Sequence, residues 1–452
     1  MPYWVNLIVE NALIFVESMK KIDALRKKYP EFVYQEFEWK YLKPNLEIWF
    51  DFLIRSTSSP NKDLKFKTQI TVKKVSNKHL NNINKRDLDN LIFHLGLIEM
   101  LNYWKLTCSP NILINARNLY REEKMFLRKT ILNGMGEYFY KNQIDFTKSG
   151  FLNIKVNQSQ PLYKASTKKL SQNKILVPIG GGKDSPVTIE LLKKKGNILG
   201  GFILNAKSSQ LKIAKIANLR EVVLIERKLD PLLLKLNKSG KFLNGHVPFS
   251  AFLAYLSLIV ALIFNYGRIV FSWEKSANEP NLKYKGRWIN HQWSKTSKFE
   301  KEFNRLAKKY LLKNVNVFSA LRKFSELEIA QIFARLKKYH SVFLSCNNAY
   351  KISAKKLKWC GECPKCLFVF AILYPFLEER ELVKIFGRNL FEDKSLLPLM
   401  LKLVGKKETK PFECVGTKKE TFLAFSLALK RAKKRKKVPF LLKKFEELHI
   451  KK

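Results

Sequence analysis

The chain has 452 residues, and its 85 Lys and Arg outnumber its 38 Asp and Glu, which gives a formal net charge of +47. A chain of this length is longer than one ordinary hydrophobic core accommodates, so two or three domains are predicted. A hydrophobic content of 46% is sufficient to form their cores. The charge would attract ATP, nucleotide sugars, RNA or anionic membranes alike, and scattered lysines also arise in a compositionally biased genome, so charge alone excludes none of these partners.

Residues 1–165 are predicted to form an N-terminal α+β domain. The segments EIWFDFLI (47–54) and KTQITVKKV (67–75) are strand-like. Residues 87–105 and 117–140 have the spacing of apolar residues that is typical of helices.

Residues 166–376 are predicted to form an α/β domain with a parallel sheet covered by helices. Short apolar strands alternate with helical stretches here, as such a sheet requires. The predicted strands are 175–179, 198–206, 221–227, 268–274 and 341–346, and the predicted helices lie near 186–195, 209–218, 249–264, 297–312 and 325–338. Ligands of such sheets bind beyond the carboxyl ends of the strands, so we expect the loops there to line the site.

A triple-glycine turn joins the first of these strands to the first helix, within KILVPIGGGKDSPVTIELLKKKG (174–196). Consecutive glycines allow positive φ and expose backbone N–H groups to an anion. We expect Ser185 at the helix N-cap and Pro186 at the first helical position, so that the helix dipole points at the same anion, and Lys183 to add a positive charge. The loop is predicted to bind phosphate, although the spacings G-x-x-x-x-G-K-[ST] and G-x-G-x-x-G are both absent.

Two apolar segments bear on localisation. The stretch MPYWVNLIVENALIFVESMKK contains Glu10 and Glu17 and has no basic leader, so it does not fit a secretory signal. Residues 242–267 lack acidic and basic side chains apart from His246, but their strongly apolar part, 249–264, is shorter than the roughly 18 to 20 residues that span a membrane. We therefore expect a buried core helix and a cytoplasmic protein without a membrane span.

The densest polar stretch, SWEKSANEPNLKYKGRWINHQWSKTSKFE (272–300), begins where the fourth predicted strand ends. The carboxylates of Glu274 and Glu279 could bind Mg²⁺ or move protons, His291 could also move protons, and Lys295 could hold a phosphate or a carboxylate. For each residue taken singly, a solvated surface position is the alternative. As a group they favour a functional site.

Four of the six cysteines are expected to bind a metal ion. Cys360, Cys363 and Cys366 lie in CGECPKC, and Cys346 lies at the end of the last predicted strand. Four thiolates complete a tetrahedral Zn²⁺ site, which would be closed and structural. An iron–sulfur cluster, whose ferredoxin-type spacing is not matched, and reduced, unligated thiols are the alternatives. Clustered cysteines without an export signal also indicate a reducing cytoplasm.

Residues 377–452 are predicted to form a basic, helical C-terminal region. Its run KRAKKRKK (430–437) could bind RNA or could be a solvated helix face.

The string GGGKDS resembles the SGGxDS loop of the PP-loop ATP pyrophosphatases, which cleave ATP to AMP and pyrophosphate and activate their substrates by adenylation. Gly180 stands where that family usually has Ser. The resemblance implies a fold like that of the adenine nucleotide α-hydrolases, with Gly181, Gly182 and Ser185 holding the β and γ phosphates. It implies that Asp184 helps to bind Mg²⁺, and it makes Gly180 and Lys183 further ATP-binding candidates.

A closer resemblance combines several motifs. GGGKDS, NGHVPFSA (244–251), SANEPN (276–281), NHQWSK (290–295), CGECPKC, PFECVGT (411–417) and HLGLIEMLNYWKLTCSP (94–110) together look like the MurL family of UDP-N-acetyl-α-D-muramoyl-L-alanyl-L-glutamate epimerases. One cysteine followed by CGxCxxC also resembles the PP-loop enzyme 7-cyano-7-deazaguanine synthase.

The MurL resemblance implies ATP- and Mg²⁺-dependent inversion of the terminal L-Glu of UDP-MurNAc-L-Ala-L-Glu to D-Glu, through an acyl-adenylate, in peptidoglycan precursor synthesis. The catalytic candidates are Asp184, Glu274, Glu279, His291 and Lys295. Cys414 is a further candidate for proton transfer, and Glu274 and His291 are favoured for that role.

Two other functions stay open. An RNA-modifying or nucleobase-forming PP-loop enzyme would use the same loop and cysteines, and the basic C-terminal region favours it. No recognisable RNA-binding module appears in the sequence, so nucleic acid is a possible partner but not the favoured one. A non-catalytic nucleotide- or RNA-binding protein with a degenerate loop is supported only by Gly180 in place of Ser.

Overall fold

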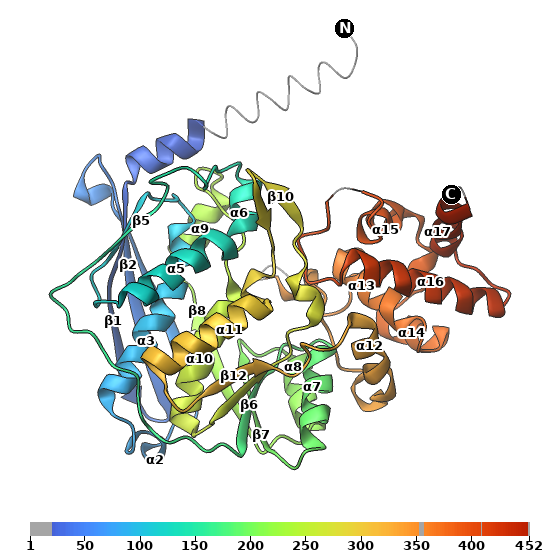
Figure 1. Cartoon of the computed structure of the whole chain (residues 1–452), viewed down its shortest axis with the longest axis horizontal. Coiled ribbons are helices and arrows are strands. Elements are labelled where there is room, and N and C mark those ends of the chain that lie inside the picture. The colour runs from blue at the N-terminus through green and yellow to red at the C-terminus, as the bar shows by residue number, and fades with distance from the viewer. Residues whose placement is uncertain (1–19, 352–356, 408, 451–452) are drawn as a thin grey trace, which may run out of the picture.

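The computed structural model describes residues 20–351, 357–407 and 409–450 (Figure 1). The stretch that was tested as a secretory signal lies almost wholly outside these residues. A ten-stranded mixed sheet forms the centre of the molecule. Its strands, in spatial order, are β12 (Asn316–Ser319), β9 (Arg268–Phe271), β6 (Lys174–Pro178), β7 (Ile198–Leu204), β8 (Glu221–Lys228), β3 (Leu64–Val72), β2 (Asn45–Arg55), β1 (Glu31–Leu42), β4 (Asn111–Ile114) and β5 (Asn153–Val156).

Strands β12, β9, β6, β7 and β8 are mutually parallel, which confirms the predicted α/β class. The N-terminal strands join the same sheet, because β3 pairs antiparallel with β8, from Gln69 opposite Lys228 to Val72 opposite Ile225. One hydrophobic core likewise contains residues from both sides of residue 165. The sheet therefore runs without a break across the predicted domain boundary.

The predicted strand at 341–346 is wrong. The fifth parallel strand is β12, and residues 341–346 form a turn and an irregular segment. Phe343 and Leu344 are nevertheless buried, and the backbone N–H of Leu344 donates to the Gly181 carbonyl at 2.7 Å. An apolar run of this length is thus accounted for by a buried irregular segment as well as by a strand.

Side chains alternate between two cores along the parallel strands. Leu176 and Ile269 face the core that contains α3 (Lys85–Glu99), α5 (Arg121–Gly134), α10 (Phe249–Phe264) and α11 (Ser297–Leu306). Ile175 and Val270 face the core that contains α7 (Asp184–Lys193), α8 (Ser208–Ile216), α12 (Glu326–Arg335) and α13 (Pro364–Leu373). Successive side chains of a strand point to opposite faces, and here both faces are apolar. Helices therefore cover both faces of this part of the sheet.

Helix α10 spans 249–264, as predicted, and ends at Asn265 in the left-handed conformation (φ 61°). Nearly all of its apolar side chains are buried, so it is a core helix. Within the described ranges, no helix has the length and apolar character needed to cross a membrane. The remaining described helices and strands near the sheet are α2 (Asn77–Leu80), α4 (Leu101–Trp104), α6 (Gly136–Lys141), α9 (Pro231–Lys238), β10 (Leu282–Tyr284) and β11 (Arg287–Ile289).

The C-terminal region is helical, as predicted, and forms the orange-to-red part of Figure 1. After α13 it contains α14 (Glu379–Phe386), α15 (Leu397–Leu403), α16 (Lys418–Lys434) and α17 (Phe440–Ile450). Several residues of the basic run on and after α16 are ion-paired. Arg431 and Arg435 contact Glu378 at 2.7 and 2.5 Å, and Lys433 contacts Glu446 on α17. These contacts attach α16 to its neighbours and favour a structural role for part of the run.

Candidate active site

The glycine loop and the polar stretch meet at the reversal point of the strand order. The chain passes outward from β6 to β7 and β8, and then places β9 and β12 on the other side of β6. Ligands of open parallel sheets bind at this reversal, beyond the carboxyl ends of the strands. The glycine loop follows β6 and Glu274 follows β9, while Thr188 and Ser272 are linked across the gap by a 2.8 Å hydrogen bond. The two loops therefore meet at the edge of the sheet where ligands of such sheets bind.

The three glycines of the loop differ in what they require. Gly181 has φ +87°, and a Cβ there would overlap the hydroxyl of Tyr350. A Cβ at Gly182 would lie 3.0 Å from Cβ of Ser345, whereas a Cβ at Gly180 would have no neighbour closer than the Ser185 hydroxyl at 3.9 Å. Gly181 is therefore needed for conformation and space. The serine that PP-loop enzymes usually carry would fit at position 180.

The predicted capping of α7 needs correction. The helix begins at Asp184 with Lys183 at the N-cap, so Ser185 and Pro186 lie two residues further inside the helix than predicted. The Ser185 hydroxyl accepts the backbone N–H of Gly180 at 3.0 Å. It holds the glycine loop against the helix instead of capping the helix, and Pro186 still lies in the first turn, where no N–H is needed.

Lys183 is turned into the protein. It is 1% exposed, and its Nζ lies 2.5 Å from Oδ1 of Asp184 and 2.6 Å from Oε2 of Glu326 on α12. Burial by itself would raise the pKa of Asp184, but the ammonium groups of Lys183 and Lys365 outweigh it and hold the pKa below its usual value. Asp184 is therefore ionised and suited to an oxygen-preferring cation such as Mg²⁺.

A second group of titratable side chains, here called the His–Cys cluster, consists of Glu137, His246, His291, Lys295 and Cys414. Nδ1 of His291 hydrogen-bonds Oε2 of Glu137, and the His291 ring also hydrogen-bonds the Cys414 thiol. Nζ of Lys295 lies 3.3 Å from the Cys414 sulfur, and the rings of His246 and His291 are 4.3 Å apart. Lys295 and His291 thus approach the Cys414 sulfur, and Glu137 and His246 contact His291.

Lys295 joins the His–Cys cluster to the end of β9. Its Nζ lies 3.9 Å from Oε1 of Glu274, which is buried. The charges of Glu274, Asp184 and Cys414 all act to raise the pKa of Lys295, so its ammonium group is retained. The cluster and the glycine loop therefore form one electrostatically connected site.

The charges of the His–Cys cluster differ from those of isolated side chains. Burial would raise the pKa of the Cys414 thiol, but Lys295 and the hydrogen bond with His291 outweigh it and lower the pKa to about 6. Burial would lower the pKa of His291, but its hydrogen bonds with Cys414 and Glu137 raise it to about 9. Burial and the neighbouring His291 lower the pKa of His246 to about 3. At neutral pH the site therefore contains a thiolate beside an imidazolium.

Glu279 lies elsewhere. It contacts Nζ of Lys410 at 3.3 Å and accepts the backbone N–H of Lys418 at 3.2 Å. It lines a cavity with Tyr140 and Trp288 and is not among the groups that surround Cys414.

Two residues of the His–Cys cluster, His246 and Glu137, were not predicted as site residues. His246 lies inside the NGHVPFSA motif, which could have identified it. No local sequence signal distinguishes Glu137 on α6 from a surface carboxylate.

The four predicted metal-binding cysteines converge. The sulfur atoms of Cys346, Cys360, Cys363 and Cys366 all lie within 4.8 Å of one another, and Cys366 lies 3.6 and 3.5 Å from Cys360 and Cys363. In a tetrahedral site with Zn–S bonds of about 2.3 Å the sulfurs are about 3.8 Å apart. The arrangement fits four-sulfur ligation of one Zn²⁺.

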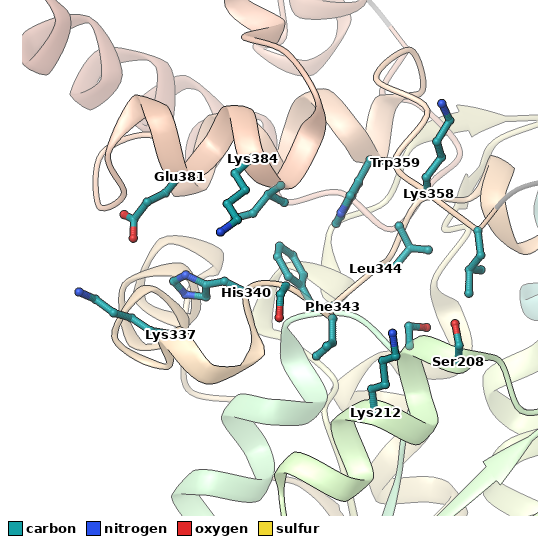
Figure 2. A pocket seen from close by; sticks show the side chains of 15 residues that line it. Ser208, Lys212, Lys337, His340, Phe343, Leu344, Lys358, Trp359, Glu381 and Lys384 are labelled. Atoms are coloured by element: carbon teal, nitrogen blue, oxygen red, sulfur yellow. The ribbon is translucent and has the colours of Figure 1, made fainter.

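A cavity of about 600 Å³ lies beside Leu344 and the start of α8 (Figure 2). Ser209 and Leu344 line it, and Leu344 is the residue that hydrogen-bonds Gly181. Its other lining residues include the aromatic Phe343 and Trp359, the carboxylate of Glu381, and the lysines Lys212, Lys337, Lys358 and Lys384. The excess of ammonium groups suits a ligand that carries phosphate.

Two family models match this chain, and each covers part of the site. Residues 24–320 match the family model of the MurL N-terminal domain, and residues 342–450 match that of the MurL C-terminal domain. The chain belongs to the MurL family. The glycine loop, Glu274, His291 and Lys295 lie in the first MurL domain, whereas the four clustered cysteines and Cys414 lie in the second. The resemblance predicted from the motifs is confirmed.

Curated relatives in the MurL family cover most of the chain. A protein of a Micromonospora species and one of Salinispora tropica are each 33% identical over 333 residues, which is 74% of this chain and 73% and 72% of theirs. A protein of Xanthomonas oryzae pv. oryzae is 34% identical over 345 residues, which is 75% of this chain and 74% of its own. All three are named UDP-N-acetyl-alpha-D-muramoyl-L-alanyl-L-glutamate epimerase.

Proposed function

We propose that this MurL-family protein inverts the terminal L-Glu of UDP-MurNAc-L-Ala-L-Glu to D-Glu in peptidoglycan precursor synthesis, at the expense of ATP. Its family and the names of its relatives support the epimerase activity. The observation that carries the proposal is the thiolate–imidazolium pair of Cys414 and His291, linked through Lys295 to the carboxylate that follows β9. Epimerisation requires such proton-transfer groups.

The need for ATP follows from the chemistry of Cα. A free carboxylate is negatively charged and opposes loss of the neighbouring proton. We propose that transfer of AMP from ATP to this carboxylate releases pyrophosphate and removes the charge, so that the carbonyl accepts electrons and the Cα proton becomes acidic. Water then releases AMP and the inverted product.

The glycine loop is the proposed site of the ATP phosphates. Backbone N–H groups of the loop, with Ser185 and the start of α7, would hold the anion. Asp184 would help to hold Mg²⁺, which would offset phosphate charge. Lys183 was predicted to contact phosphate, but its ammonium group is held by Asp184 and Glu326, so we assign it to positioning Asp184.

The four clustered cysteines are proposed to hold a structural Zn²⁺. All four ligand positions would come from protein thiolates, so the ion would have no open position for substrate. Its role would be to fix the segment 341–350, which contacts the glycine loop, against the start of α13.

The experiment that tests the proposal combines purified protein, ATP, Mg²⁺ and UDP-MurNAc-L-Ala-L-Glu. We expect pyrophosphate and AMP to be released only when the muramyl substrate is present. A parallel reaction replaces this substrate with bulk tRNA. Release of pyrophosphate with tRNA, but not with the muramyl substrate, would instead support the RNA-modifying alternative.

A further inference from the structure

The proposed reaction needs a group that is deprotonated at neutral pH and able to accept the Cα proton. In the His–Cys cluster, the carboxylate of Glu137 is already bound by His291 and by Lys141. His291 is bound to Glu137 through Nδ1 and to Cys414, and both partners favour its protonated form. Of the two directions of proton transfer, His291 therefore suits donation of a proton and not its removal from Cα.

The sulfur of Cys414 meets the requirement. Lys295 approaches it to 3.3 Å, His291 hydrogen-bonds it, and Nζ of Lys365 donates to the Cys414 carbonyl and fixes the backbone. The two cations stabilise the thiolate, while Glu137 contacts His291 and Glu274 lies 3.9 Å from Lys295, so that both carboxylates favour the charged forms of these cations. The carboxylate of Glu413, the residue before Cys414, accepts a hydrogen bond from the backbone N–H of Lys365 at 3.0 Å.

We propose that Cys414 is the catalytic base that removes the Cα proton of the adenylated glutamyl residue from one face, an inference that rests on the proposed function. The Cα–H bond breaks, an S–H bond forms, and the electron pair moves onto the acyl oxygen as an enolate. A proton from a donor on the opposite face then forms the new Cα–H bond and restores the carbonyl. Proton exchange with solvent returns both groups to their starting states.

The alternative use of a thiolate is nucleophilic attack, in which Cys414 would displace AMP and form a thioester. The two roles differ in what can be isolated. A base forms no bond to the substrate carbon, whereas a nucleophile leaves the acyl group on the protein.

The test compares the natural protein with Cys414→Ser, and with Cys108→Ala as a control that removes a buried thiol outside both cysteine-containing sites. Two steps are measured separately. Muramyl-substrate-dependent exchange of labelled pyrophosphate into ATP reports adenylation, and deuterium incorporation at Cα in D₂O reports proton transfer. Intact mass after acid quench reports any acyl adduct, and thermal melting reports folding.

We expect Cys414→Ser to melt like the natural protein, to keep pyrophosphate exchange within about threefold, and to lose deuterium incorporation by at least about 10²-fold, because a hydroxyl does not ionise near neutral pH. Cys108→Ala should keep both steps. Deuterium incorporation close to normal in Cys414→Ser would overturn the inference. So would loss of both steps in a folded variant, or an acyl adduct on the natural protein.

Failure of the proposed function itself would look different. In that case the natural protein would show no muramyl-dependent pyrophosphate exchange, so Cys414 would have no adenylate to act on and the inference would fall with it.

Discussion

At the scale of single residues, the charge of Cys414 is set by its neighbours. A buried thiol by itself is neutral at pH 7, and Cys108 shows this, since burial raises its pKa to about 11. Cys414 is partly buried, which would also raise its pKa, but Lys295 and His291 reverse the effect and lower the pKa to about 6. The same side chain thus favours the neutral form in one place and the thiolate in the other, because two cations adjoin Cys414.

This difference predicts the pH dependence of alkylation. The rate at which iodoacetamide labels Cys414, followed on its own peptide by mass spectrometry, should be half-maximal near pH 6 and should fall below that pH as the thiolate is protonated. Lys295→Gln should move the midpoint upward, because it removes the nearest ammonium group. A midpoint near pH 9 in the natural protein would contradict the assigned charges.

The glycine loop predicts unequal tolerance at adjacent positions. Gly181→Ala should reduce AMP formation by at least about tenfold, because it combines a positive φ that costs about 1 kcal/mol with steric overlap at Tyr350. Gly180→Ser is the matched control and should keep activity within about threefold, because that position has room. Equal losses in steady-state AMP formation would show that the loop is not held as described.

At the scale of elements, irregular segments position the site. Residues 341–350 carry Leu344 to the glycine loop and Cys346 to the start of α13, so one segment connects the loop to the cysteines. Helix α16 is anchored through buried Ala424, Phe425 and Ala428, although its sequence is strongly basic.

The cysteine cluster predicts about one Zn²⁺ per chain by elemental analysis. Cys363→Ser should lose the metal and lower the melting temperature by at least about 5 °C, because ligation free energy contributes directly to folding. Cys108→Ala should retain the zinc. A brown preparation that contains iron would instead indicate an iron–sulfur cluster.

The packing of α16 predicts that two of its side chains contribute unequally to the free energy of unfolding. Phe425→Ala should lower the free energy of unfolding by about 3–5 kcal/mol, because the ring is fully buried. Leu423 lies on the same helix and is 50% exposed, so Leu423→Ala should change the free energy of unfolding by less than about 1 kcal/mol. Urea unfolding measures both, and equal effects would mean that α16 is not packed against the core.

At the scale of the whole molecule, the site is assembled from both MurL domains. The first domain supplies the glycine loop, His291 and Lys295, and the second supplies Cys414. Neither domain alone contains the thiolate with its two cations, so the proposed proton transfer depends on their packing.

Short apolar runs predicted four of the five parallel strands between β12 and β8, and a long apolar run predicted the core helix 249–264, because these elements depend on local sequence. The pairing of β3 with β8 was not predictable, since its partners lie far apart in the chain. The same limit applies to the site. Motifs predicted the glycine loop, the cysteines and His291, but the contact of His291 with Glu137 is formed only by the tertiary fold.

The central claim is that this protein inverts a glutamyl centre when ATP is present. Its most direct test is chiral analysis of glutamate hydrolysed from UDP-MurNAc-L-Ala-L-Glu after incubation with the protein and Mg²⁺, with and without ATP. We predict that D-Glu accumulates with ATP and is absent without it. Glutamate that remains entirely in the L form, while ATP is present and the protein is folded, would contradict the account.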